Sequence, residues 1–580
     1  MDSFIDCISC CEPTTLQELL QQTTDQKIQT LGTLTTIALK SFSNKAVWGL
    51  KRCWNCRDIR LVGLIESDFY SFICSLPSVT EAWTLQHGSE CSITSLSMDN
   101  CVICPEAYEA LFHCFSTPCL TGLKHLTIKP MDEDKGSRMN EKNWRCICDR
   151  LKMGSCPSLE SICLPGNCIG TAGVEALMEV YHDGHIKRCT ELDLTGNYIG
   201  DKGAIALASL FDIPNMCTDM TTLKLGNNKI RSKGWDTFLT HFAAVTHSSL
   251  QTLDISYNSP NVENMQTLWH TLETGVCPQL HSLNVSGITF KPQSAISMAT
   301  TIRANAFKYL EELKMDDCSL STECVEHICR AISDSPLQLL HHLSLAKNRL
   351  NQRSLQILCN ILQKDTLPSL VYLDLSCNKI SDEGIQELNN RYKDDVLTQV
   401  ETLDLSDNCI SNEGAFVIFD NIRHHQWKSL HDLNLQRNKF TAVTGVQLRS
   451  LLEMDNELDT IHLTDLTKRR ANVPLYRRED RMGETHTRMN RPKSQEKDEE
   501  QAEKHITTEQ QTTESMGEHT TQTETKTAVE GIAIPPLHEE LKKEGELSPT
   551  AFSVSFNKHI HTKHRFSMYS LRTRGTNRNP

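Results

Sequence analysis

The sequence predicts an α/β solenoid, with short parallel strands on an inner face and helices on an outer face. The first observation is the segment LDLSCNKI at residues 373–380, which fits the pattern L-x-L-x-x-N-x-I and returns thirty residues later as LDLSDNCI at 403–410. The second is a stripe of apolar residues at i, i+3, i+4 and i+7 behind the copies, the spacing of an amphipathic helix. Strand, turn and helix therefore make up each repeat.

Steps of thirty residues in both directions from Asn378 reach the same position of every repeat. These positions are Cys101, Met131, Asn167, Asn197, Asn228, Asn258, Ile288, Cys318, Asn348, Asn378, Asn408 and Asn438, with one slip of six residues and one of a single residue. An asparagine amide can satisfy the backbone groups that a bend removes from the sheet, so we interpret the asparagines as structural. Cys101 and Cys318 fit this position as small buried groups.

The leucines of each L-x-L segment predict the strands. Residues two positions apart face the same side of a strand, so each segment is half buried. We expect parallel strands on one sheet at residues 192–194, 223–225, 253–255, 283–285, 313–315, 343–345, 373–375, 403–405 and 433–435.

The apolar stripes predict the helices. Each stripe begins seven residues after its asparagine, as at Val174 and Trp235, and we expect the helices to begin there. A glycine often comes directly before this first apolar residue, at Gly173, Gly203, Gly234, Gly384 and Gly414. We interpret these glycines as points where strand-to-helix packing leaves no room for a side chain.

This unit resembles the leucine-rich repeats of the ribonuclease-inhibitor class, a type found also in Ran GTPase-activating proteins and in the repeat regions of NOD-like receptors. The resemblance covers about residues 91–466. It implies a horseshoe in which parallel strands line the inner face, helices form the outer face, and each repeat touches mainly its neighbours. Because packing residues define the class, the resemblance implies little about function.

The chain falls into three predicted parts. Residues 1–90 are expected to form a helical N-terminal cap with degenerate repeats, because a terminal repeat needs a covered face. Residues 91–466 are the repeat array of period about thirty. Residues 467–580 are rich in Thr, Glu, Gln, Lys and Arg without periodicity, so we expect a disordered charged tail.

Three local features refine these boundaries. The segment Thr15-Leu16-Gln17-Glu18 fits a capping box that opens a helix in the N-terminal part. The six extra residues after Met131 are polar, and we interpret them as a surface loop. Leu458, Ile461 and Leu463 predict one last strand without a following helix.

The cysteines indicate a reducing compartment. The 25 cysteines follow no N-terminal apolar signal segment, so we expect reduced, mostly buried thiols in the cytoplasm, with the nucleus as the alternative. No apolar run approaches the ~18 residues of a membrane span. Cys7 with Cys10 and Cys53 with Cys56 have C-x-x-C spacing, which four zinc-bound thiolates would also show. The pairs lie too far apart for a compact zinc site, so we expect no metal and no cofactor.

The charge distribution separates the tail from the rest of the chain. The chain carries 59 basic and 73 acidic residues, of which 20 and 17 lie from Thr467 onward. The preceding part therefore holds 39 and 56 and has a net charge of −17. An acidic body does not suit a nucleic-acid backbone, so we do not expect nucleic acid as a partner. The run Lys468-Arg469-Arg470 fits a nuclear signal, a contact with an acidic surface, or a solvated linker.

The predicted binding surface consists of two rows of side chains. The concave row, on the strands, is Asp193, Lys224, Asp254, Asn284, Lys314, Tyr372, Asp374, Asp404 and Asn434. The rim row, directly after the asparagines, is Lys229, Arg349, Lys379 and Lys439. Acid on the concave face and base at the rim suggest a partner of complementary charge, although polar residues are also the ordinary solvated side of a half-buried sheet.

Two functions from different classes follow. The chain has no G-x-x-x-x-G-K-[ST], G-x-S-x-G or H-E-x-x-H motif, so we expect no catalytic residues. The favoured function is a non-enzymatic scaffold that binds a protein partner on the concave face. The alternative, implied by the resemblance, is a GTPase activator of the Ran type that positions a small GTPase.

Overall fold

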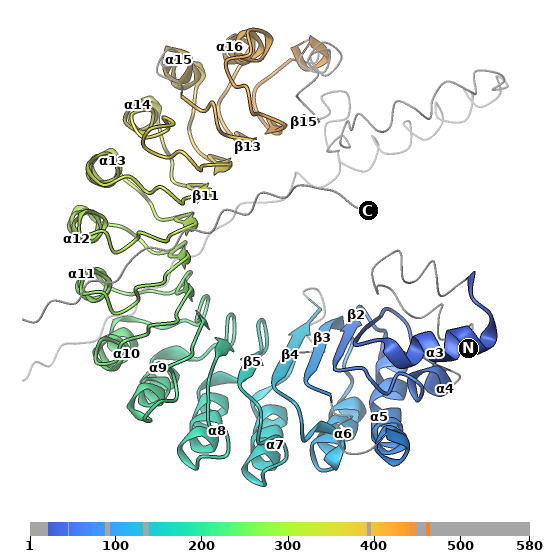
Figure 1. The fold of residues 1–580 in the computed structure, drawn as a ribbon. Helices are drawn as coiled ribbons and strands as arrows, with labels where there is room; N and C mark the ends of the chain where they lie inside the picture. The colour runs from blue at the N-terminus through green and yellow to red at the C-terminus, as the bar shows by residue number, and fades with distance from the viewer. Residues whose placement is uncertain are drawn as a thin grey trace, which may run out of the picture. The chain divides into compact units, whose positions relative to one another are not determined.

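The computed structural model describes residues 21–43, 46–87, 93–131, 138–390, 396–441, 444–447 and 460–463. The chain divides into two units, Met1–Thr487 and Arg488–Pro580, and all described residues belong to the first. In this described part, fifteen strands form one sheet whose spatial order follows the chain (Figure 1). Every neighbouring pair is parallel, which confirms the predicted single sheet.

The strands are short from β5 onward and longer before it. They are β1 (Thr36–Leu39), β2 (Asp58–Val62), β3 (Ser95–Cys101), β4 (His125–Pro130), β5 (Ser161–Cys163), β6 (Glu191–Asp193), β7 (Thr222–Lys224), β8 (Thr252–Asp254), β9 (Ser282–Asn284), β10 (Glu312–Lys314), β11 (His342–Ser344), β12 (Tyr372–Asp374), β13 (Thr402–Asp404), β14 (Asp432–Asn434) and β15 (Thr460–His462). From β6 to β14 each strand begins and ends one residue before the predicted range. The second leucine of each segment, such as Leu375, follows the ladder yet is fully buried. β15 is the predicted last strand.

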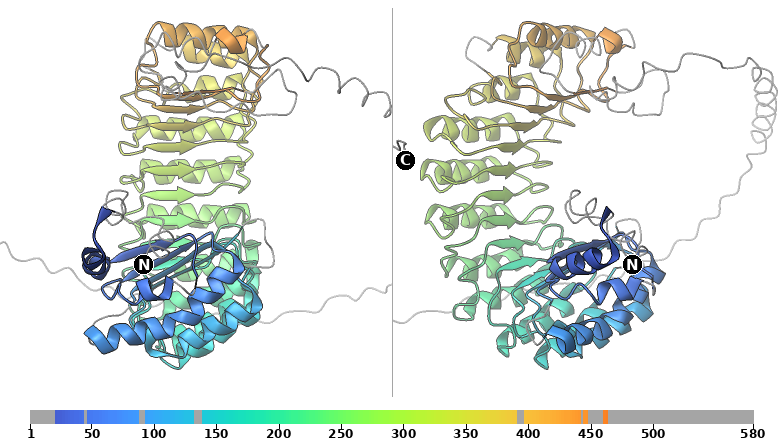
Figure 2. Two further views of the ribbon diagram at one scale, coloured as in Figure 1. Left: turned by 90° about the vertical axis from the view of Figure 1, so that its right-hand side faces the viewer. Right: turned by 45° about the vertical axis from the view of Figure 1, so that its right-hand side comes forward.

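Helices alternate with the strands and cover the outer side of the sheet (Figures 1 and 2). They are α3 (Thr24–Thr33), α4 (Val47–Leu50), α5 (Glu66–His87), α6 (Pro105–Phe115), α7 (Glu141–Lys152), α8 (Gly170–His182), α9 (Gly200–Ala208), α10 (Ser232–Ala243), α11 (Val262–Glu273), α12 (Pro292–Arg303), α13 (Thr322–Asp334), α14 (Gln352–Leu358), α15 (Asp382–Asn390) and α16 (Asn412–Arg423), with the 3-10 turns η2 (Pro118–Leu120) and η4 (Ser209–Asp212). No helix in the described ranges is both long and apolar enough to cross a bilayer.

The helices begin earlier than the sequence predicts. α16 starts four residues after Asn408, not seven, and α8 starts three residues after Asn167. The prediction was wrong because the first helical turn is polar and carries no apolar stripe. At α16 the Ser411 hydroxyl accepts a hydrogen bond from the Glu413 amide at 3.3 Å and caps this polar turn.

The repeat asparagines form a buried ladder. Asn228 is fully buried, and its Nδ2 donates to the carbonyl oxygens of Leu194 at 2.8 Å and Leu225 at 3.0 Å. Its Oδ1 accepts from the amide of Asn197 at 2.8 Å, so one side chain joins two repeats. Cys318 occupies the same position, and its thiol donates to the Val285 carbonyl at 3.3 Å. Each side chain thereby satisfies backbone groups that the bend leaves outside the sheet.

The glycines at the helix starts allow neighbouring helices to approach. At Gly234 in α10 an added Cβ would lie 2.9 Å from the Cα of Asp201 in α9. At Gly414 it would lie 2.5 Å from Asp382 Oδ1, which accepts the Gly414 amide at 3.0 Å. The close contact thus includes the preceding helix as well as the strand-to-helix connection.

The sheet begins within the first 90 residues, where β1 and β2 pair in parallel and extend it. β2 contains Ile59 and Leu61, and the long helix α5 follows. Several sequence features lie outside the described residues: the capping box at Thr15, the cysteines Cys7 and Cys10, the insertion at residues 132–137, and the tail from Thr467 onward.

Candidate protein-binding surface

The structure places the predicted concave row on the open face of the sheet. In β6–β10 and β12–β14 the middle residue is buried, whereas both flanking residues are half-buried and face away from the core. The last residue of each strand belongs to the predicted row, from Asp193 in β6 to Asn434 in β14. β11 differs, because Ser344 is buried and donates to Asp316. Tyr372 begins β12 and lies one position before Leu373.

The carboxylates of this row also hold the turns that follow the strands. Asp374 Oδ1 accepts the backbone amide of Ser376 at 2.8 Å, and Asp404 Oδ1 accepts that of Ser406 at 2.8 Å. Asn284 Oδ1 makes the same bond to the Ser286 amide at 3.1 Å. An amide oxygen can therefore replace the carboxylate in this role, and the negative charge at Asp374 and Asp404 is not needed for the turn.

In the first half of the sheet, concave carboxylates have partners on neighbouring strands. Lys129 Nζ lies 3.6 Å from Asp99 Oδ1, and Lys224 Nζ lies 3.7 Å from Asp193 Oδ2. Asp254 Oδ2 accepts from Asn284 Nδ2 at 3.0 Å. Opposite charges on adjacent strands stabilise the sheet modestly. Among the described residues, Glu191 and Asp254 have no basic partner within 4.0 Å, so this half keeps a smaller acidic surplus.

The second half carries a surplus of carboxylates, which we call the acidic patch. It consists of Glu312, Asp316, Asp374, Asp404 and Asp432, on or directly after β10, β12, β13 and β14. Lys314 pairs with Glu312 at 2.6 Å. Within the described residues, no Lys, Arg or His lies within 4.0 Å of the carboxylates of Asp316, Asp374 or Asp404. Burial, together with the charges of Asp404 and Asp316, raises the pKa of Asp374.

An aromatic pair lies in the middle of the acidic patch. The rings of His342 and Tyr372, register partners on β11 and β12, stack with centroids 4.1 Å apart and planes 13° from parallel. Burial, with the nearby charges of Asp374 and Asp404, raises the pKa of Tyr372 to about 12. Burial also lowers the pKa of His342, so its imidazole is neutral at pH 7 and does not offset the carboxylates.

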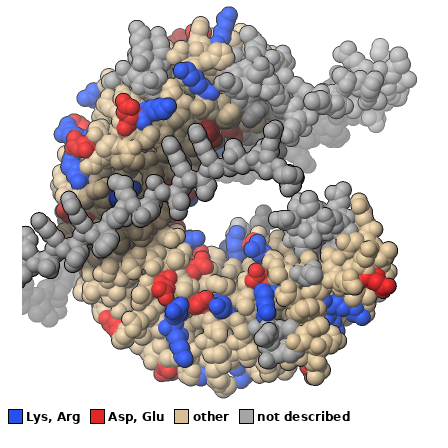
Figure 3. All heavy atoms as spheres, viewed as in Figure 1, with Lys and Arg blue, Asp and Glu red and all other residues tan. Residues whose placement is uncertain are grey.

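The predicted rim residues Lys229, Arg349, Lys379 and Lys439 are all exposed. The ammonium of Lys229 lies 4.3 Å from the ring centroid of Tyr198, a cation–π contact. Tyr198 and Tyr257 are 45% and 47% exposed. Arg437 pairs with Asp407 on the preceding repeat. The rim therefore mixes bases with exposed aromatic rings, and Figure 3 shows both charge signs interspersed over the visible surface.

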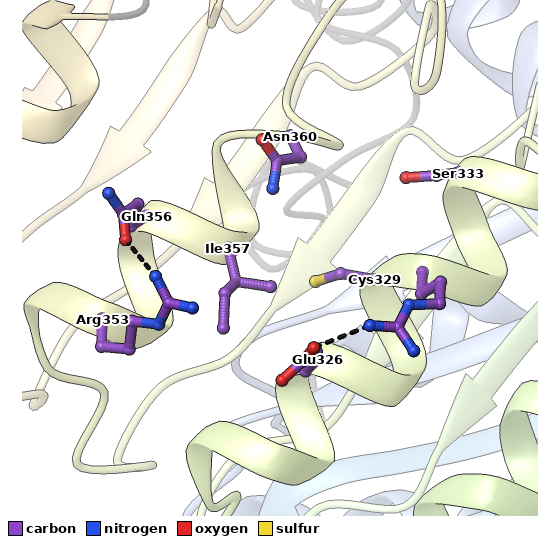
Figure 4. Close-up of a pocket in the computed structure, with 8 residues that line it drawn as sticks. Glu326, Cys329, Ser333, Arg353, Gln356, Ile357 and Asn360 are labelled. Atoms are coloured by element: carbon purple, nitrogen blue, oxygen red, sulfur yellow. Dashed lines mark hydrogen bonds and ion pairs between the residues drawn. The ribbon is translucent and has the colours of Figure 1, made fainter.

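A groove of about 540 Å³ lies on the outer face between α13 and α14 (Figure 4). It opens because α14 has seven residues and α13 has thirteen. Its arginines are satisfied within their own helices: Arg330 by Glu326 at 2.7 Å and Arg353 by Gln356 at 2.5 Å. The groove therefore offers no convergent charge to a ligand, and the concave face is the better candidate.

A group of potential metal ligands lies at the starts of α5 and α6. The ligand atoms of Glu66, Cys104 and Glu106 lie within 4.8 Å of one another, and a hollow of about 600 Å³ adjoins them. Both glutamates occupy first helical turns, where negative charge stabilises the helix dipole and the helix ends oppose a cation. The dipole explains this arrangement without a metal.

Most of the described cysteines are buried, whereas Cys74 is exposed. None of the 21 described cysteines forms a disulfide. The thiols of Cys53 and Cys56 donate to the carbonyls of Gly49 and Asp58 at 3.5 and 3.3 Å. Burial raises the pKa of Cys101 to about 11 and that of Cys318 to about 12, so these thiols stay protonated and are weak nucleophiles at neutral pH.

Sequence reasoning missed two features of this surface. The stacking of the His342 ring on Tyr372 and the hydrogen bonds of the concave aspartates to the turn amides were not predicted. The contact between the two rings could have been predicted from the thirty-residue interval between His342 and Tyr372, since this interval makes them register partners on neighbouring strands. The hydrogen bonds to the turn amides could have been predicted from the aspartates that precede Ser376 and Ser406 by two residues.

Comparison with known proteins supports the repeat assignment. A leucine-rich repeat family model matches residues 155–178, 190–208, 366–388 and 397–419. A search of curated proteins finds no match to the chain.

Solved structures that resemble the chain include several repeat proteins. A leucine-rich repeat protein of Leptospira interrogans is 14% identical, with 76% of this chain and 98% of that chain covered and a TM-score of 0.33. The mouse RP105/MD-1 complex is 14% identical over 72% of this chain and 73% of that chain, with a TM-score of 0.33. A Listeria monocytogenes internalin is 15% identical over 77% and 92%, with a TM-score of 0.27. These likenesses are too distant to inform function.

The matched segments fall in two stretches of the array, around α8–α9 and around α15–α16. Between them the strands pair in the same register and the helices continue to alternate with them. The family model, the period and the single parallel sheet agree, and the chain is a leucine-rich repeat protein.

Proposed function

We propose that the protein is a non-enzymatic scaffold that binds a protein partner on the concave face of its sheet. The acidic patch is the observation that carries this proposal. Three of its aspartates, Asp316, Asp374 and Asp404, have no Lys, Arg or His within 4.0 Å among the described residues. They lie near the half-buried pair of Tyr372 and His342 on an open sheet face. Aromatic side chains contribute much of the binding energy of protein interfaces, and unmatched charge selects a partner of the opposite sign. The partner therefore presents a basic segment to β10–β14.

The repeat architecture supports this choice of face. In a solenoid each repeat packs on its two neighbours, so the strands stay open to solvent along the whole concave side. The outer side is covered by helices, and some of their charged residues pair with one another, as Arg303 does with Asp334 at 2.8 Å. The acidic patch lies on the concave side, where a long partner segment can contact several repeats at once.

Partner capture with charge-reversed variants tests the proposal. The immobilised full chain is compared with the variant that carries both Asp374→Lys and Asp404→Lys, and captured proteins are quantified by mass spectrometry. We expect specific partners to be lost. The matched control, Asp420→Lys with Glu326→Lys, changes the net charge equally on the exposed sides of α16 and α13 and should retain them.

Two further measurements decide how a loss of partner capture is interpreted. Asp374→Asn with Asp404→Asn keeps an oxygen for the turn bonds and removes only charge, so it should weaken capture in a folded protein. Equal capture by wild type and the reversed variant would contradict the concave site. Acceleration of GTP hydrolysis by the chain, in an assay with small GTPases, would contradict the non-enzymatic scaffold and favour a GTPase activator.

A further inference from the structure

A basic segment follows the last described strand, β15, in the sequence. Residues 468–481, with the sequence KRRANVPLYRREDR, hold six basic and two acidic residues. The segment begins five residues after Leu463, the last described residue, which follows the edge strand β15. Contact with an acidic surface is one of the three roles that fit its first three residues, Lys468-Arg469-Arg470.

The linker is long enough for the segment to reach the patch. Five residues span at most about 17 Å. β15 and β12 are three strands apart, which is about 14 Å at the usual strand spacing. Lys468 can therefore reach Tyr372 on β12, and the fourteen residues that start there exceed the distance from β14 to β10.

The chemistry of the segment matches that of the patch. Its basic residues are five arginines and Lys468. A guanidinium stacks on an aromatic face and donates to carboxylates at the same time, which an ammonium does less well. The Tyr372 ring, with Asp374 on its own strand and Asp404 on the next, offers both kinds of contact.

We propose that residues 468–481 dock on the acidic patch of their own chain and compete there with the partner. This inference rests on the proposed function, because it assigns a regulator to the same surface. A short tether gives the segment an effective concentration of the order of millimolar, so even weak affinity keeps the patch largely occupied. The partner must then displace the segment, and removal of its charges exposes the site.

Competition with a labelled peptide tests the proposal in the full chain. The probe is a fluorescent synthetic peptide of residues 466–482, and its affinity is measured by fluorescence anisotropy. In the tail variant, Arg469, Arg470, Arg477 and Arg478 are each replaced by Gln. The matched control replaces Lys563, Arg565, Arg572 and Arg574 by Gln, which removes the same charge farther along the chain.

We expect the tail variant to bind the probe about tenfold or more tightly than wild type and the control do, as removal of a tethered competitor predicts. Adding Asp374→Lys and Asp404→Lys to the tail variant should abolish binding. Equal affinity in wild type, tail variant and control would overturn self-docking and leave partner capture on the concave face unaffected. Failure of the tail variant to bind the probe would also overturn it, and the proposed function would then be decided by partner capture alone.

Discussion

Asp374 both stabilises the turn after β12 and contributes negative charge to the concave surface. Its Oδ1 accepts the Ser376 amide, and its charge lies opposite Asp404 on the next strand. Burial and the charges of Asp404 and Asp316 raise its pKa above the usual value. A carboxyl whose pKa is higher in the folded state contributes stability below its unfolded pKa and loses it as the pH rises through the folded pKa. At neutral pH the ionised Asp374 is therefore unfavourable for stability.

Asp374→Asn should raise the free energy of unfolding at pH 7 by about 0.2–1 kcal/mol, the range for a like-charge pair directly opposite on two strands. The amide retains the turn bond, as it does at Asn284. Urea unfolding at pH 7 and near pH 4 checks this, because the difference from wild type should shrink as Asp374 becomes protonated. Asp374→Ala is the control, which loses the bond and should be less stable than Asn. A destabilised Asn variant would contradict this account.

The asparagine ladder makes a second residue-level prediction. Asn228→Ala leaves the carbonyls of Leu194 and Leu225 and the amide of Asn197 without their side-chain partner. Each buried group left unsatisfied costs about 1–3 kcal/mol, so the thermal midpoint should fall strongly. Asn228→Cys should lose less, because a thiol serves this position at Cys318. Equal losses for Ala and Cys would show that the hydrogen bonds do not matter.

At the scale of single residues, the sequence predicts roles that recur in every repeat, but not contacts that depend on side-chain direction. The position of Asn228 could be predicted, because the same residue returns at a fixed interval in a bend that needs a hydrogen-bonding group. The period also places Asp374 and Asp404 side by side. The stack of His342 on Tyr372 depends on rotamers, and the absence of a base beside Asp374 in the described structure depends on how Lys314 turns toward Glu312.

At the scale of helices, the spacing of α9 and α10 depends on Gly234. A methyl group there would meet the backbone of Asp201 at 2.9 Å and Ile230 Cγ2 at 2.9 Å. Gly234→Ala should destabilise the protein by about 1–3 kcal/mol through overpacking, although alanine favours a helix by about 1 kcal/mol. Gly384→Ala is the matched control, since its nearest atoms, at 3.1 and 3.3 Å, belong to movable side chains. Denaturant unfolding should separate the two variants, and equal midpoints would contradict the close approach of the helices.

Asp374, the last residue of β12, and Leu375, which directly follows it, make a contrasting pair. Leu375 is fully buried, and Leu375→Ala should lower the free energy of unfolding by about 2–5 kcal/mol. Asp374→Asn, one residue away on the opposite face, should not lower it. Because each repeat packs on its neighbours, hydrogen exchange should accelerate first in β11–β13 and least in β3. Uniform acceleration across the sheet would indicate that the array opens as one unit.

Element boundaries show why part of the architecture could not be predicted. The leucine spacing predicts the ends of β6–β14 to within one residue. Both leucines of an L-x-L segment must face the same buried side of a strand, and this fixes the position of the strand along the chain. The helix starts were placed too late, because the polar first turns resemble loops until their caps are seen, as at Ser411. β1 was not predicted, because Thr36–Leu39 contains no L-x-L segment. Only its pairing with β2 identifies it as a strand.

At the scale of the molecule, the distribution of charge is more informative than its total. The part before Thr467 is acidic, yet the described concave face pairs two of its carboxylates with lysines on β3–β9 and accumulates more carboxylates on β10–β14. Net charge alone predicts a preference for basic partners. Because the surplus carboxylates lie on β10–β14, we expect a basic partner to bind these five neighbouring strands. A single extended segment can cover them.

The concave and rim charges should affect different rate constants of the same complex. Rim residues Lys379 and Lys439 are exposed, and a partner of complementary charge faces them with acidic groups beside its basic segment. Replacing both with Gln should therefore slow association with a captured partner by less than about tenfold and leave dissociation unchanged. It should also flatten the dependence of the association rate on salt. Asp374→Asn with Asp404→Asn removes charge that the partner covers, and should instead speed dissociation. Surface plasmon resonance at two ionic strengths measures both rates. Faster dissociation after the rim changes would move the binding surface from the strands to the rim.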